Sequence, residues 1–158
     1  MRIWFLVPLL IAFVVVGAAP VAAAQPTPIV GTESFEADLT AGVLNCGGGV
    51  FFPHEFEGKG RFTHLGKVTS AIFADSCSVS GSTLEATGHA THTAANGDSI
   101  DVVFSGSANL ATGAIVFDII EITGGTGRFE GASGTLEGVG SISGTTGEFT
   151  VWGMLIRS

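Results

Sequence analysis

Two acidic residues, Asp118 and Glu121, interrupt the most apolar run of the sequence after residue 25, and they are the first candidates for chemistry. A carboxyl group inside an apolar interior can act as a general acid or base. In a regular strand, residues three apart point to opposite faces, so only one of the two would face inward. A bulge or a strand end would place both in water, and we favour this second arrangement.

The four histidines, His54, His64, His89 and His92, are the residues that could bind a metal. His89 and His92 are three apart in a predicted strand, so they point to opposite faces and cannot chelate together. Because no spacing resembles a zinc site, we expect no metal and no cofactor, and histidines that are solvated or hydrogen-bonded. The sequence also lacks the Gly-x-Ser-x-Gly motif of a serine nucleophile.

The first 24 residues have the pattern of a secretory signal peptide. Met1-Arg2 gives a positive start, residues 3–16 are apolar apart from Pro8, and Ala22-Ala23-Ala24 precedes Gln25. The apolar run is shorter than the roughly 20 residues that a membrane-spanning helix needs. We expect cleavage after Ala24 and a secreted or otherwise extracytoplasmic protein with no membrane span. Retention of the segment as an uncleaved anchor is the alternative.

Cys46 and Cys77 are the only cysteines, so they are the only pair that can form a disulfide, and we expect them to be bridged. An oxidising compartment favours this bridge. Two free thiols, or a metal site shared with a histidine, are the alternatives.

The composition limits the partners. Six basic residues face fourteen acidic ones, which gives a formal net charge of −8. A protein that binds nucleic acid needs a basic face toward the phosphates, so we expect no nucleic-acid partner. Charged residues make up only 13% of the chain and apolar ones 46%, which argues against a disordered chain.

The pattern after residue 25 is that of an all-β protein. Short runs of Val, Ile, Thr and Phe alternate with Gly-rich turns, and helical periodicity is missing. Asn96-Gly97 is a strong hairpin signal, because a type I′ turn needs positive φ at both central residues. We predict eight strands, at residues 34–39, 57–64, 67–75, 83–92, 99–105, 114–123, 134–143 and 148–156.

Eight consecutive strands joined by short turns favour an antiparallel up-and-down barrel over a sandwich, because closure removes exposed strand edges. We expect a flexible lead-in over residues 25–32 and one barrel domain over residues 33–158. The one long connection, residues 40–56, is the candidate lid. Strand alternation places both cysteines at one end of the barrel and the turns after the second, fourth and sixth strands at the other.

Small residues occupy alternate positions in two predicted strands, around residues 84–90 and 136–142. On inward faces they would either open a cavity or let large side chains cross the barrel axis, and we favour the second. The weak candidates for contact with a ligand are Phe62, Phe104, Phe117 and Trp152.

The segment 124–134 reads Gly-Gly-Thr-Gly-Arg-Phe-Glu-Gly-Ala-Ser-Gly, and it resembles the Gly-Gly-x-Gly-x-Phe-x-x-Ala-x-Gly turn of allene oxide cyclases and dirigent proteins. Two shorter segments, 63–67 and 95–98, resemble turns of secreted bacterial barrels of the same type. The resemblance implies an eight-stranded, calycin-like barrel, often a homo-oligomer, that acts on apolar or aromatic substrates. It transfers no reacting residue, because those proteins often use a Tyr and this sequence has none. We assign structural turn roles to Thr63, His64, Gly66, Asn96, Gly97, Asp98, Gly124, Gly125, Gly127, Arg128 and Phe129.

The leading functional hypothesis is a secreted barrel that binds a small apolar ligand or acts as a non-catalytic scaffold. The alternatives are a cyclase or isomerase that guides an apolar substrate, and a filled structural or surface-interaction barrel. We expect the turn end to be closed, with Asp98 and Arg128 paired and His64 as a third member. Any mouth for a ligand would then lie at the cysteine end.

Overall fold

The computed structural model describes residues 24–158, so the predicted signal peptide lies outside it apart from Ala24. Within this range no helix has the length and apolar character needed to cross a membrane. The elements are β1 (Thr27–Gly47), β2 (Val50–Phe62), β3 (Gly66–Ser80), β4 (Thr83–Ala94), β5 (Ser99–Asn109), β6 (Ala114–Gly125), the 3₁₀ turn η1 (Gly127–Phe129), β7 (Ser133–Ser143) and β8 (Thr146–Ile156).

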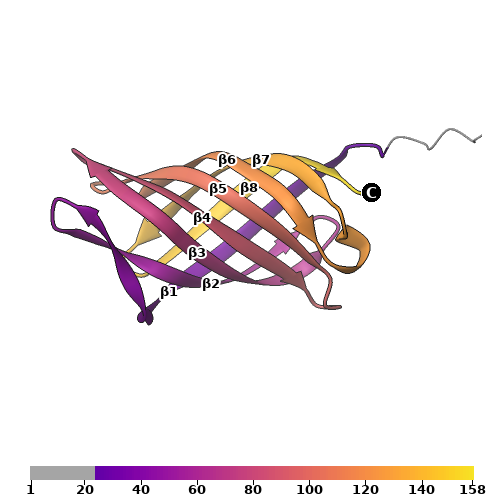
Figure 1. The fold of residues 1–158 in the computed structure, drawn as a ribbon, viewed down its shortest axis with the longest axis horizontal. Coiled ribbons are helices and arrows are strands. Elements are labelled where there is room, and N and C mark those ends of the chain that lie inside the picture. The colour runs from indigo at the N-terminus through magenta and orange to yellow at the C-terminus, as the bar shows by residue number, and fades with distance from the viewer. Residues whose placement is uncertain (1–23) are drawn as a thin grey trace, which may run out of the picture.

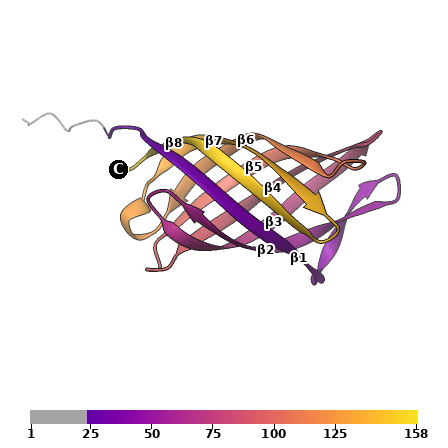
Figure 2. The same ribbon diagram turned by 180° about the vertical axis from the view of Figure 1, so that it is seen from behind.

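The eight strands form a closed antiparallel barrel in sequence order, which confirms the predicted fold (Figure 1). Each strand pairs with the next one along the chain, and β1 closes the barrel by pairing with β8 from Thr27↔Leu155 to Glu36↔Thr146. Figure 2 shows β1 and β8 side by side along the wall. No strand edge is left open along the closed wall, which is the advantage that favours a barrel over a sandwich.

The lead-in predicted for residues 25–32 is largely a strand. β1 begins at Thr27, and Pro28 pairs with Met154 and Val30 with Trp152 of β8. Pro28 suggested a loop because proline lacks the backbone N–H that a ladder uses. The segment is nevertheless a strand because its pairing with β8 closes the barrel, and without it β8 would keep an open edge.

The predicted long connection, residues 40–56, is also mostly strand. β1 and β2 continue past the barrel as a two-stranded ribbon, residues 39–54, with pairs such as Val43↔Pro53 and Asn45↔Phe51 (Figure 1). A register shift follows Asp38, and the ribbon turns at Gly48 and Gly49, which have positive φ. Glycine adopts this backbone conformation without strain. The glycines that predicted a loop therefore form the tight turn of a hairpin.

Several glycines of the inner wall face large side chains. A Cβ at Gly31 would collide with the Phe62 ring, and one at Gly88 would lie 2.5 Å from Cζ of Phe104. Phe62 is the direct partner of Gly31 across β1 and β2, and Phe104 is the direct partner of Gly88 across β4 and β5. The glycines therefore let each ring lie over the neighbouring strand. Part of the interior stays hollow, which is the cavity alternative and not the crossing of the barrel axis that we favoured.

Candidate functional site

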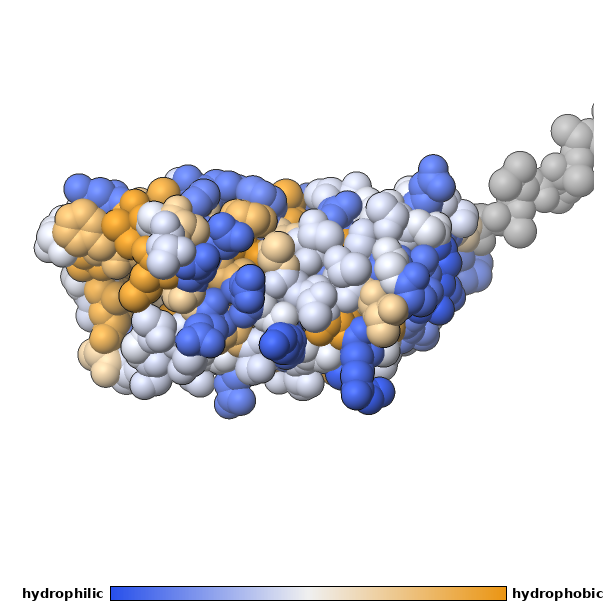
Figure 3. Space-filling model, turned by 90° about the horizontal axis from the view of Figure 1, so that it is seen from below, coloured by the Kyte–Doolittle hydropathy of each residue, from blue (hydrophilic) through white to orange (hydrophobic). Residues whose placement is uncertain are grey.

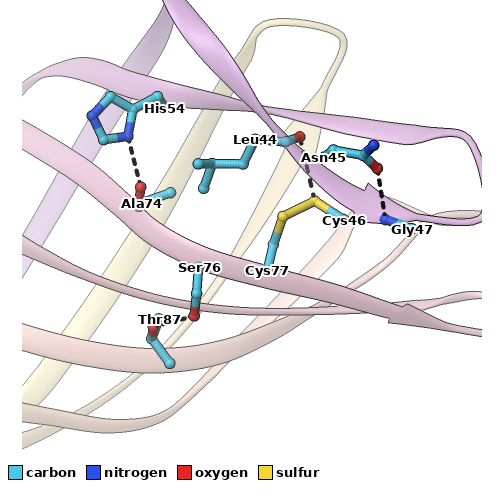
Figure 4. Close-up of a disulfide and its surroundings, with 9 residues drawn as sticks. All are labelled: Leu44, Asn45, Cys46, Gly47, His54, Ala74, Ser76, Cys77 and Thr87. Atoms are coloured by element: carbon cyan, nitrogen blue, oxygen red, sulfur yellow. Dashed lines mark hydrogen bonds between the residues drawn. A yellow bond between two sulfur atoms is a disulfide. The ribbon is translucent and has the colours of Figure 1, made fainter.

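One disulfide joins Cys46 and Cys77, as predicted, with Cα atoms 4.9 Å apart (Figure 4). It fastens the ribbon to β3. Cys46 forms a small buried cluster with Leu84 and Ala108 at this end of the barrel, and Phe52 of the ribbon packs against it. The ribbon therefore covers part of the barrel end, and we call this end, with its bridge, the disulfide end.

A cavity of about 100 Å³ lies in the disulfide half of the barrel. Its wall is almost wholly apolar, and the small residues Ala86 and Ala90 help to leave the space open. Of the predicted ligand contacts, three line it: Phe62, Phe104 and Phe117. The fourth, Trp152, lies on the outer wall with 40% of its surface exposed, so it does not face the cavity.

Three polar side chains lie at the inner limit of the cavity. Glu33, Ser70 and His92 are exposed by only 3%, 6% and 5%. The Ser70 hydroxyl donates to Glu33 Oε2 at 2.9 Å and lies 2.7 Å from His92 Nδ1. His92 Nδ1 also lies 3.1 Å from Glu33 Oε2. We call these three residues the polar cluster.

Missing side chains on β2 make room for this cluster. Ser70 and His92 are direct neighbours on β3 and β4, but Glu33 must reach them across β2. Gly58 is the residue of β2 opposite Ser70, and a Cβ there would collide with Glu33 Oε1. A Cβ at Gly60 would lie 2.9 Å from Glu33 Cα. The carboxylate thus lies in a space that only glycine leaves.

The polar cluster meets the cavity through His92. The imidazole lines the cavity and packs against the Phe62 ring, with centroids 4.9 Å apart. A serine protease-type triad has the serine on one ring nitrogen and the acid on the other. Here Ser70 and Glu33 both contact Nδ1, so the geometry is not that of a hydrolase triad. It holds the imidazole in place at the wall of the cavity.

Asp118 and Glu121 lie on the outer face of the barrel. Both Asp118 and Glu121 are exposed, although the spacing of a regular strand would turn one inward. The reason is a bulge in β6, where the pairing with β7 jumps from Phe117 to Ile120. The extra residue shifts the face by one position, so Phe117 and Ile120 both point inward. The bulge alternative for these acids is therefore correct.

The other histidines have separate partners. His54 Nδ1 lies 2.8 Å from the Ala74 carbonyl oxygen, and His89 contacts Asp75 at 3.0 Å. His64 Nε2 lies 3.0 Å from the Pro28 carbonyl oxygen, so it is not a third member of the Asp98–Arg128 pair. Among residues 24–158 no group of three metal-ligating side chains comes together.

The recurrent turns lie together at the end opposite the disulfide. They join β2 to β3, β4 to β5 and β6 to β7, and we call this end the turn rim. Arg128 Nε lies 3.1 Å from Asp98 Oδ2, and its guanidinium lies over the Phe129 ring. A Cβ at Gly127 would collide with Asp98. Ser99 and Thr126 add a hydroxyl contact of 3.0 Å across the same rim.

Comparison with protein family models, with curated proteins and with solved structures found no match to the chain. The fold and the site define its class: an all-β, eight-stranded antiparallel closed barrel with one disulfide.

Sequence reasoning missed the polar cluster as a site. A usable signal existed, because His92 continues the alternation of Ala86, Gly88 and Ala90 on the inner face of β4. Glu33 has the same parity as Phe35 in β1. Applying the two-residue period of a strand to these positions turns both side chains inward.

Proposed function

We propose that this barrel is an extracytoplasmic protein that binds a small apolar molecule in its interior. The observation that carries the proposal is the apolar cavity that extends from the polar cluster toward the disulfide end. Apolar surface gains from leaving water, and a preformed hollow is the usual place for it. The resemblance of segment 124–134 to proteins that act on apolar or aromatic substrates supports the same conclusion.

The size of the cavity narrows the ligand class. At about 100 Å³ it is smaller than the roughly 300 Å³ or more of a drug-sized pocket. It is closer to an engineered protein cavity of about 150 Å³ that binds benzene. The ligand is therefore a single small ring or a short alkyl group, or the narrow end of a larger molecule.

The compartment rests on two observations. The Cys46–Cys77 bridge is stable where thiols are oxidised, and the first 24 residues have the pattern of an export signal.

Benzene is a suitable probe for the cavity. We expect saturable binding to the wild-type protein, followed by NMR shifts of the methyl groups that line the cavity. Ala86→Leu fills part of the space and should weaken binding at least about tenfold. Ala114→Leu is the matched control, because Ala114 is exposed on β6 and its substitution leaves the cavity untouched. A wild-type protein that binds neither benzene nor phenol would refute the proposal.

An isomerase that moves a proton on an apolar substrate is the second candidate function. The supporting observation is His92, an imidazole held by a carboxylate at the wall of an apolar cavity. In D₂O such a base would remove an α-proton from cyclopentanone, and the enolate would take up deuterium. We expect NMR to detect this exchange with the wild-type protein and to lose it with His92→Phe; a rate equal to buffer alone excludes this candidate.

A further inference from the structure

The hydrogen bonds of the polar cluster fix which nitrogen of His92 carries a proton. Ser70 uses its single hydroxyl proton to donate to Glu33 Oε2. The contacts of Nδ1 with the Ser70 oxygen and with Glu33 Oε2 must then be made by an N–H on Nδ1, since both oxygens accept. In the neutral ring, Nε2 therefore carries a lone pair and is an acceptor.

Nε2 has no partner within residues 24–158. The hydrogen-bond contacts of the His92 ring are all made at Nδ1. Nε2 is not one of the fully buried atoms, so it borders accessible space. Because the imidazole lines the cavity, that space is the cavity itself. An acceptor in an apolar wall is costly when it has no partner, so a hydrogen bond donated by the ligand stabilises the complex.

Glu33 and Ser70 have the properties of residues that position His92, not of residues that contact a ligand. Glu33 and Ser70 are buried and lie behind the imidazole, and neither lines the cavity. Glu33 Oε1 is fully buried and has no hydrogen-bond partner in the described part of the chain, so the structure accepts an unfavourable placement of this carboxylate. Such a placement is typical of a functional site, where a second residue orients the one that binds.

We propose that the ligand is an apolar molecule with one hydroxyl group, bound with that hydroxyl donating to His92 Nε2. Its apolar body lies along Phe104 and Phe117 toward the disulfide end. His92 is the recognition residue, and Glu33 and Ser70 are positioning residues that keep the acceptor on Nε2. This inference deepens the proposed function and rests on it, because it names the chemical class of the ligand in the same cavity.

Phenol and benzene form a matched pair of probes that differ by one hydroxyl. We expect the wild-type protein to bind phenol about tenfold more tightly than benzene, the gain of one good hydrogen bond. The imidazole ¹⁵N spectrum should show the Nε2 resonance of His92 moving with phenol and not with benzene. Binding constants come from NMR titration at a pH where the His92 ring is neutral by its own ¹⁵N shift.

Two variants test the residues. His92→Phe replaces one flat ring by another and should abolish the preference for phenol while benzene still binds. Glu33→Gln serves if that variant does not fold. Its amide can donate to Nδ1, which leaves the ring proton on Nε2 and removes the acceptor. The preference should again fall about tenfold. His89→Phe is the control, because His89 lies on the outer face and its substitution leaves the preference unchanged.

The outcomes separate the two proposals. If neither probe binds the wild-type protein, the proposed function itself fails. If both bind with equal affinity and the His92 resonance stays in place, the apolar cavity is retained and the hydroxyl inference is overturned. A phenol preference that survives in both folded variants overturns it as well.

Discussion

The two ends of the barrel are built differently inside. Near the turn rim, Ile29, Ile100, Phe129 and Leu155 have no exposed surface. Toward the disulfide end, inner residues such as Phe35 keep 9% exposure and Phe104 is only partly buried, because the cavity adjoins them. One wall of eight similar strands can therefore hold a solid core at one end and a hollow at the other, with the polar cluster between them.

The outer surface also differs between the two ends. Apolar side chains gather at the disulfide end, as Figure 3 shows, and they include Leu39, Val43, Phe51 and Leu110. The turn rim instead carries the charged pair of Asp98 and Arg128. The hollow end therefore presents apolar groups, whereas the solid end combines this charged pair with exposed Val30, Trp152 and Met154 on β1 and β8.

Removing a ring from the solid end should have the largest effect. Phe129→Ala deletes a fully buried ring at the turn rim, and we expect a loss of about 3–5 kcal/mol in the free energy of unfolding. Phe104→Ala should lose less, because the Phe104 ring already adjoins open space. Urea denaturation of both variants measures the order, and a larger loss for Phe104→Ala would contradict a solid turn rim and a hollow disulfide end.

Removing the disulfide tests the hollow end. The double variant Cys46→Ser/Cys77→Ser should lose about 3–4 kcal/mol, the entropy of closing a loop of this length in the unfolded chain. It also frees the ribbon from β3, so benzene should exchange faster with solvent. Urea denaturation gives the first quantity and NMR exchange spectroscopy the second. Unchanged exchange in the folded variant would show that the ribbon does not control entry.

The charged pair of the turn rim should matter for stability alone. Arg128→Ala removes an ion pair in which the arginine side chain is 48% and the aspartate 20% exposed, so we expect a loss of only about 0.5–1 kcal/mol. Benzene affinity should stay at the wild-type value, because neither Arg128 nor Asp98 lines the cavity. A folded variant that loses binding would mean that ligands enter at the turn rim and not at the disulfide end.

The smallest effect concerns the base of the ribbon. The Thr40 hydroxyl and its backbone N–H both donate to Asp38 Oδ1 and hold the pKa of that carboxyl below its ordinary value. A folded pKa below the unfolded one means that the stabilisation is present above the unfolded pKa and is lost as the pH falls through the folded one. Wild type should therefore lose slightly more stability than Thr40→Val on acidification. Urea midpoints between about pH 5 and pH 3 measure this, and equal slopes would contradict it.

The fold was predictable because alternation and turn residues are local signals. Asn96-Gly97 and the runs on either side of it mark a hairpin without reference to the rest of the chain. The errors came from β1, where Pro28 and the glycines near residue 48 looked like loops. Their strand pairing depends on β8 and β2, partners that a local pattern does not contain.

The site was harder to predict, for a physical reason. Glu33, Ser70 and His92 meet from three strands, and Glu33 reaches the others only because Gly58 is opposite Ser70. Register sets that meeting, and a shift of one residue would turn the side chains outward. Asp118 and Glu121 both lie on the outer face because of a bulge in β6. The apolar residues around them give no sign of that bulge in the sequence.

The collision between a Cβ at position 58 and the Glu33 carboxylate also constrains how this protein can evolve. A lineage that gains a side chain at 58 must first shorten or lose the acid at 33, and one that loses the acid has no further need of glycine there. Mutations at the two positions are therefore epistatic. Across descendants the pair should change together, as a long acid with glycine or a short residue with a larger one. A long acid at position 33 together with glycine at position 58 would then identify the polar cluster even in relatives whose turn sequences differ.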